Sequence, residues 1–248
     1  MKTQRICCLS GTTLKLIAAV SMLIDHIGVI LFPAVPVLRV IGRLAFPLFA
    51  FMIAEGADYT RNKLRYFLMI LVLGVLCQAV YFAVGGEPYM NVLITFAIAI
   101  LLIYALQYAK RTLLREGATW AARILACALP VLATGATYVF CRFVPVDYGF
   151  VGCTMPLLAA LPSFRGMEAP ARLTRIDTIP IRAMMLIVGL VPLCIQNWPV
   201  QLSSLLAIPL LFLYSGKRGR LRMKYFFYVF YPLHLALLYG IHMLILLF

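Results

Sequence analysis

The chain lacks the polar, charge-rich stretches that a soluble domain needs. Only 12% of its 248 residues are Asp, Glu, Lys or Arg, whereas 64% are apolar, and the mean hydropathy is +1.00. Soluble domains have about 25% charged residues and about half apolar residues. We therefore predict an all-α bundle of transmembrane helices that forms a single domain over residues 1–248.

Several motifs of well-known sites are also missing. The sequence has no Walker A motif, no GxGxxG, no CxxC and no GxSxG, which argues against a P-loop, a dinucleotide site and a serine-hydrolase elbow. The seven cysteines are odd in number and scattered, and the three histidines and few carboxylates show no metal-ligand spacing. We therefore expect no metal site.

Acidic residues are scarce, with 8 against 22 basic residues and a net charge of +14. Nucleic-acid binding is one explanation of such an excess. However, the Lys and Arg residues collect in alternate loops, starting with Lys2 and Arg5 and including Lys110 and Arg182, as cytoplasmic loops of membrane proteins do. We therefore expect contact with membrane lipid, no nucleic-acid partner and a cytoplasmic N-terminus.

Apolar runs broken by charge predict about nine membrane spans, within a range of about eight to ten. The sixth run is short, and the seventh and eighth are joined only by Asn197-Trp198, so either is a candidate for a re-entrant or broken element. The nine runs cover residues 14–32, 38–56, 65–84, 91–109, 121–143, 149–162, 182–196, 199–214 and 225–247.

Two ionisable residues, Asp25 and His26, lie within the first run. At a helix rise of about 1.5 Å per residue, His26 is roughly 15 Å from the inner end and about 9 Å from the outer end. Ionisable groups are costly in hydrocarbon and persist where they face a protein interior or a wet cavity. We therefore interpret both as site residues.

Arginines in the second run reach the same depth. The connection between the two runs is short, so the helices should be antiparallel neighbours, with Arg43 level with Asp25 and His26. Arg39 lies one turn nearer the outside, on the face of Arg43. The simplest arrangement pairs Asp25 with Arg43 and leaves His26 facing a cavity. Pro47, four residues after Arg43, predicts a kink that leaves the Arg43 carbonyl without its helical partner.

His234 and Glu55 complete the candidate catalytic set. His234 lies roughly 14 Å from the inner end of the last run and could meet His26 in the bundle core. An interhelical hydrogen bond explains a lone intramembrane histidine equally well, so both interpretations of His234 stay open. Glu55, at the inner end of the second run, is either catalytic support or a solvated helix end.

Five further residues are candidates for binding a cofactor. Lys217 and Arg218 form a Gly-Lys-Arg-Gly loop that could grip phosphates, although ordinary orientation charge explains them too. The others are Arg61 on the inner edge of the second run, Asn91 at the start of the fourth, and Tyr231 just before His234.

Taken in order, these motifs resemble the TraX family of bacterial membrane proteins, and the likeness covers nearly the whole chain. Ser215 departs from the family pattern, which often has Asn there. The matching segments are Lys15 to Ala18, Met22 to Gly28, Ile41 to Phe49, Glu55-Gly56, Thr60 to Asn62, Asn91 to Thr95, Asp147 to Gly149, Tyr214 to Gly219 and Lys224 to His234.

The resemblance implies a multi-pass protein of the bacterial cytoplasmic (inner) membrane. It also implies membrane-embedded acetyl transfer, from cytosolic acetyl-CoA to a pilin N-terminus or another amine or hydroxyl such as a surface glycan. The family's early-helix His and following Arg correspond to His26 and Arg43 here. We expect His26 to act as general base, or to carry an acetyl group, and Arg43 to stabilise the oxyanion.

Two other classes of function fit the same residues. Intramembrane acid, base and Arg also suit a proton-coupled transporter, although the sequence shows no related halves of the kind many transporters have. Alternatively, the buried polar groups hold helices together in an assembly factor of a conjugation or secretion system.

Overall fold

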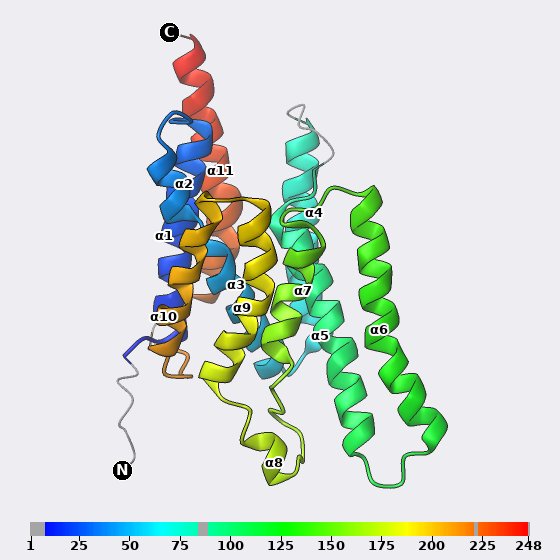
Figure 1. Cartoon of the computed structure of the whole chain (residues 1–248). Helices are drawn as coiled ribbons and strands as arrows, with labels where there is room; N and C mark the ends of the chain where they lie inside the picture. The colour runs from blue at the N-terminus through cyan, green and yellow to red at the C-terminus, as the bar shows by residue number, and fades with distance from the viewer. Residues whose placement is uncertain (1–7, 84–88, 221–222, 248) are drawn as a thin grey trace. The chain divides into compact units, whose positions relative to one another are not determined.

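The computed structural model describes residues 8–83, 89–220 and 223–247, and every regular element in these ranges is helical (Figure 1). The helices in chain order are α1 (Gly11–Ile30), α2 (Pro36–Gly42), α3 (Ala45–Tyr59), α4 (Lys63–Ala83), α5 (Val92–Leu114), α6 (Trp120–Phe143), α7 (Gly149–Ala160), α8 (Ala171–Thr174), α9 (Ile179–Gln196), the 3-10 helix η1 (Val200–Leu206), α10 (Ala207–Phe212) and α11 (Lys224–Leu247).

Seven of the described helices are long and apolar enough to cross a membrane, with α2 and α3 counted as one. Two shorter apolar helices, Gly149–Ala160 and Val200–Phe212, coincide with the short sixth run and the eighth run. The predicted all-α multi-pass membrane fold is therefore confirmed. The N-terminal orientation stays a prediction, and Lys2 and Arg5 lie outside the described residues.

The helices fall into two compact units, with the boundaries inside α3 and inside α9. The first unit joins the start of the chain, up to Met52, to the part from Leu190 onward, and the second holds Ile53–Gly189. In the first unit α1 packs against α2 and α11, and η1 packs against α2. In the second unit α5 packs against α4, α6 and α7. The prediction of a single domain stays a prediction.

Small residues let α1 and α2 approach each other closely. A Cβ placed on Gly28 would lie 2.8 Å from the Cβ of Leu38, and one on Gly42 would overlap the side chain of Asp25. Both distances are shorter than carbon atoms tolerate, so only glycine fits at these two positions. The contact holds the Asp25 carboxylate directly against the end of α2.

The second membrane-crossing segment breaks between α2 and α3, beside Arg43. The Leu44 N–H donates to the carbonyl of Ile41 (3.4 Å), so the Val40 carbonyl accepts instead from the Ser203 hydroxyl (2.6 Å). Pro47 is the third residue of α3, where a helix needs no N–H donor. The interruption predicted from Pro47 is therefore present, as a break between two helices.

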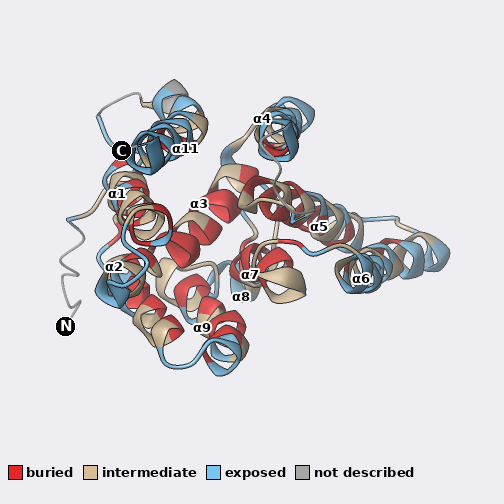
Figure 2. Ribbon diagram, turned by 90° about the horizontal axis from the view of Figure 1, so that it is seen from above, coloured by how far each residue is buried: buried red, intermediate tan, exposed pale blue. Residues whose placement is uncertain are grey.

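In the second unit, burial concentrates on α5 and α7 (Figure 2). In α5, 56% of the apolar window is buried, against 17% in α4 and 11% in α6. Because the exposed residues of α4 and α6 are mostly apolar, we expect these two helices to face lipid.

Candidate functional site

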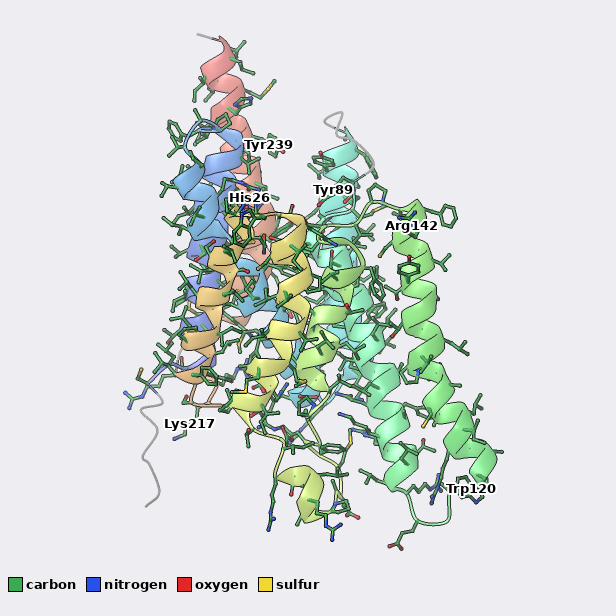
Figure 3. The ribbon with its side chains drawn as sticks, in the orientation of Figure 1. His26, Tyr89, Trp120, Arg142, Lys217 and Tyr239 are labelled. Carbon is green, nitrogen blue, oxygen red and sulfur yellow. The ribbon has the colours of Figure 1, made fainter. Side chains whose placement is uncertain are left out.

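Two histidines meet in the first unit, one from α1 and one from α11. Nδ1 of His26 lies 2.9 Å from Nε2 of His234, and the ring centroids are 4.9 Å apart. The meeting predicted from the depth of both residues is therefore confirmed. Figure 3 shows His26 among the side chains of this unit.

The hydrogen bonds of His234 fix which nitrogen of His26 carries the proton when both rings are neutral. Nδ1 of His234 lies 2.7 Å from the carbonyl oxygen of Phe230, which only accepts, so this nitrogen must donate. Nε2 of His234 is then the acceptor, and Nδ1 of His26 donates to it. Nε2 of His26 then keeps its lone pair, because Nδ1 is the nitrogen that carries the proton in the histidine–histidine hydrogen bond.

Aromatic rings hold His234 in place. The Phe230 ring stacks on the imidazole at 4.8 Å, and the Tyr231 ring meets it edge-on at 5.7 Å. His234 is 4% exposed, so its ring has little freedom to turn. Tyr231 therefore supports the histidine pair, and its predicted role toward a cofactor stays a prediction.

Asp25 lies between two arginines, and its closer partner differs from the one we expected. Its Oδ2 is 2.6 Å from Nη1 of Arg39, whereas its Oδ1 is 3.8 Å from Nη2 of Arg43. The expected pairing of Asp25 with Arg43 is present, but as the longer of two contacts, because α2 ends at Gly42 and Arg43 follows as its C-cap. Arg39, inside the helix, faces the carboxylate instead.

This charge cluster has unused hydrogen-bonding capacity. Nε of Arg43 and Oδ1 of Asp25 are buried and form no hydrogen bond with any residue in the described ranges. One carboxylate and two guanidinium groups leave one positive charge in excess. A buried donor with excess positive charge stabilises an oxygen that becomes negative.

Glu55 belongs to a different ionic cluster, in the second unit. Nη1 of Arg182 lies 2.5 Å from Oε1 of Glu55, and Nη2 lies 2.9 Å from Oδ2 of Asp58. Arg182 is 1% exposed. The Glu55 carboxylate is therefore paired with a buried cation, and its predicted catalytic role stays a prediction.

The same cluster closes the end of α7. Nζ of Lys110 donates to the carbonyl oxygens of Ala160 (3.0 Å), Leu161 (2.8 Å) and Ser163 (2.7 Å). Nε of Arg182 donates to the carbonyl of Ala159 (3.0 Å). We had interpreted Lys110 and Arg182 as loop charge, and this was wrong, since both are buried. Their positions inside the apolar helices α5 and α9 were the available signal.

The Gly-Lys-Arg-Gly loop is tied to the start of α1 through its backbone. The carbonyl of Lys217 accepts from the Gly11 N–H (2.8 Å), and that of Arg218 from the Thr12 N–H (3.1 Å) and hydroxyl (2.7 Å). These N–H groups are thus already bonded, while both basic side chains are exposed. Figure 3 shows Lys217 far from His26, which lies 15 residues along α1 from Gly11, or about 22 Å.

The remaining two candidates for a cofactor lie in the second unit. The Asn91 side chain caps α5 by accepting from the Leu93 N–H (3.0 Å), and it donates to Gly74 (2.9 Å) and Gln78 (3.0 Å). Arg61 is exposed between α3 and α4. Asn91 is thus engaged in internal contacts, and the cofactor role of both residues stays a prediction.

Comparisons with known proteins agree with these motifs. The chain is similar to a probable fimbrial assembly protein, FimC of serogroup H1, from Dichelobacter nodosus, with 26% identity over 251 residues that cover 92% of this chain and 94% of the relative. It is also similar to the uncharacterized protein RP591 of Rickettsia prowazekii (strain Madrid E), with 36% identity over 93 residues, 37% of this chain and 35% of the relative. No solved structure matches.

A family model matches almost the whole length of the chain, including both histidines and the Asp25 cluster. The model is that of the TraX protein, and the match covers residues 10–242. The resemblance inferred from the ordered motifs is thereby confirmed, and the chain belongs to the TraX family.

Proposed function

We propose that this protein is a membrane-embedded acetyltransferase that moves an acetyl group from acetyl-CoA to an amine or hydroxyl acceptor. The proposal rests mainly on one hydrogen-bond chain, which runs from the Phe230 carbonyl through His234 to His26. This chain leaves Nε2 of His26 as a free base. Neutral imidazole is suited to this role at physiological pH.

The proposed reaction uses two groups of the first unit. Nε2 of His26 takes the proton from the acceptor nitrogen or oxygen as that atom attacks the thioester carbonyl carbon. The Arg43 guanidinium, with its unpaired Nε, stabilises the oxyanion. The intermediate then expels the CoA thiolate, which receives the proton from His26. In the covalent alternative, Nε2 itself attacks and carries the acetyl group before the acceptor takes it.

The spacing along α1 favours transfer between the two sides of a membrane. The exposed Lys217 and Arg218 side chains lie beside the start of α1, where they would meet the phosphates of cytosolic CoA. His26 is only four residues from the opposite end of α1, or about 6 Å. An acceptor arriving from outside would therefore travel a short way to reach it.

The acceptor class is supported by the family and by one relative. The D. nodosus relative is named a probable fimbrial assembly protein, which favours a pilin-like peptide amine; a surface glycan hydroxyl is the other acceptor we propose. The same name also supports an assembly factor without enzymatic activity, and intramembrane charges suit a proton-coupled transporter.

The decisive experiment is acetyl transfer by the purified protein. Wild type, His26→Ala and His242→Ala are incubated in detergent with radiolabelled acetyl-CoA and a peptide with a free N-terminal amine. We expect His26→Ala to lose roughly 10²- to 10⁴-fold in rate while its unfolding midpoint is retained, and His242→Ala, the control, to keep full activity. Turnover of His26→Ala at the wild-type rate would overturn the proposal. An unstable His26→Ala variant, with no transfer by wild type, would favour the assembly factor.

A further inference from the structure

Gln201, in η1, is a buried residue whose side-chain carboxamide has no hydrogen-bond partner among the described residues. The residue is 1% exposed, and neither Oε1 nor Nε2 forms a hydrogen bond with any residue that the structure describes. Native proteins satisfy the large majority of their buried side-chain polar atoms. Two unsatisfied atoms on one side chain are therefore an exception that needs an explanation.

The backbone of Gln201, in contrast, is fully engaged. Its N–H donates to the Asn197 carbonyl (3.1 Å), and its carbonyl accepts from the Ser204 hydroxyl (2.6 Å) and the Cys194 thiol (3.5 Å). The residue is thus held firmly in place. Among the described residues only its carboxamide is left without a hydrogen bond.

Other buried glutamines show that this chain pairs its carboxamides elsewhere. Gln78, 5% exposed, donates from Nε2 to the Tyr89 carbonyl (3.0 Å) and accepts at Oε1 from the Asn91 N–H (2.9 Å). Gln201 is therefore an exception among comparable residues, and Gln78 provides a matched control.

The element that carries Gln201 adjoins the element that ends at Arg43. Within the first unit η1 packs against α2, and the Ser203 hydroxyl donates to the Val40 carbonyl (2.6 Å). Val40 lies three residues before Arg43, whose Nε is also buried and without a partner in the described ranges. The unpaired polar groups of the first unit thus belong to adjoining elements.

We propose that the Gln201 carboxamide binds a secondary amide of a substrate. A carboxamide and a secondary amide each offer an N–H donor and a carbonyl acceptor, so two hydrogen bonds form and both ends of Gln201 are satisfied. A carboxylate or an ammonium ion would satisfy only one end. The assignment rests on the proposed function, whose reactants present such amides in two places, the pantetheine arm of CoA and the backbone of a peptide acceptor.

Binding to Gln201→Met tests the assignment and separates the two sources. The probes are S-acetylpantetheine, which has amides but no nucleotide, and trialanine, titrated into the detergent-purified full chain. We expect the dissociation constant of one probe to rise roughly ten- to a hundredfold while the other stays unchanged, which identifies the source. Unchanged binding of both probes, or no binding of either to wild type, would overturn the assignment.

Stability provides a second readout. Since the Gln201 carboxamide has no partner to lose among the described residues, Gln201→Met should unfold at the same temperature as wild type or higher, whereas Gln78→Met should unfold at a lower one. Gln201→Asn keeps the polar group but shortens its reach, and it should weaken the same probe. A lowered midpoint for Gln201→Met with unchanged probe binding by Gln201→Asn would mean a role in the fold, contrary to the assignment.

A separate measurement of acetyl transfer by wild type tells apart two outcomes: that Gln201 does not bind an amide, and that the protein is not an acetyltransferase. No transfer by wild type, together with weaker trialanine binding by Gln201→Met, would overturn the function and leave amide binding standing. Normal transfer and normal probe binding by Gln201→Met and Gln201→Asn would overturn amide binding alone.

Discussion

The two arginines beside Asp25 differ in what they contact. Arg39 makes the short ion pair at 2.6 Å, while Arg43 lies 3.8 Å away and keeps an unpaired Nε. A charge-assisted hydrogen bond at the first distance contributes to stability, and the longer contact contributes less. Substitution of the two arginines should therefore affect different properties of the protein.

We predict that Arg39→Gln lowers stability and that Arg43→Gln lowers the rate of acetyl transfer. Loss of the Asp25–Arg39 bond should cost about 1–2 kcal/mol, because both groups are partly exposed. Loss of an oxyanion donor should reduce kcat roughly 10²- to 10³-fold. Unfolding midpoints and initial rates of both variants check this, and an Arg43→Gln enzyme with normal kcat would contradict it.

Some residues of the candidate site could be predicted from the sequence, because they are ionisable residues inside apolar runs. Asp25, His26, Arg43 and His234 were found because ionisable groups stand out in apolar runs. Lys110 and Arg182 were misinterpreted because they lie near the ends of such runs, where loop charge is expected. Gln201 gave no signal, since an unpaired amide is recognised only when its surroundings are known.

At the scale of elements, α7 shows how a short helix can end inside a bundle. Its 12 residues extend about 18 Å, less than the hydrocarbon thickness of about 30 Å. Backbone carbonyls left open there must be satisfied within the protein. Lys110 and Arg182 do this from neighbouring helices.

We predict that Lys110→Met destabilises the protein by about 2–4 kcal/mol. The substitution leaves three carbonyl oxygens without their hydrogen-bond donor and removes a cation from a helix C-terminus. The exposed neighbour Arg111 is the control, and Arg111→Met should change stability by less than about 0.5 kcal/mol. Denaturant unfolding of both variants provides the measurement. Equal effects would show that Lys110 is ordinary surface charge.

We also predict opposite effects for two glycine-to-alanine changes. Gly42→Ala should cost about 1–3 kcal/mol, because the added methyl overlaps Asp25. Gly135→Ala, in α6, meets nothing within 4 Å and should stabilise by about 0.4–1 kcal/mol. Unfolding midpoints decide the matter, and a tolerated Gly42→Ala would disprove the close contact of α1 with α2.

At the scale of the whole molecule, hydropathy was enough to find the membrane helices, and the break beside Arg43 followed from Pro47. The backbone pairing of the segment before α1 with the segment after α10 could not be predicted. Hydrogen bonds such as that from the Leu9 N–H to the Leu213 carbonyl (3.0 Å) join backbone atoms. Because every residue carries these atoms, no side-chain pattern predicts such bonds.

The side of the membrane on which residues 161–178 lie depends on whether α7 crosses it. With the predicted cytoplasmic N-terminus, crossing by α7 puts this basic segment in the cytoplasm, as its arginines favour, whereas a non-crossing α7 puts it outside. We predict that a single cysteine replacing exposed Arg172, in a chain without its native cysteines, resists an impermeant maleimide in intact cells. Trp198→Cys, 69% exposed, should react as the external control. Labelling of Arg172→Cys in intact cells would mean that α7 does not cross.

The discontinuous first unit has a consequence for biogenesis. Asp25 and Arg39 are 14 residues apart, so they can neutralise each other as soon as the first helical hairpin leaves the translocon. His26 is separated from His234 by 208 residues and must wait until the whole intervening segment has been synthesised. A chain released early from stalled translation would therefore carry the ion pair without the second imidazole.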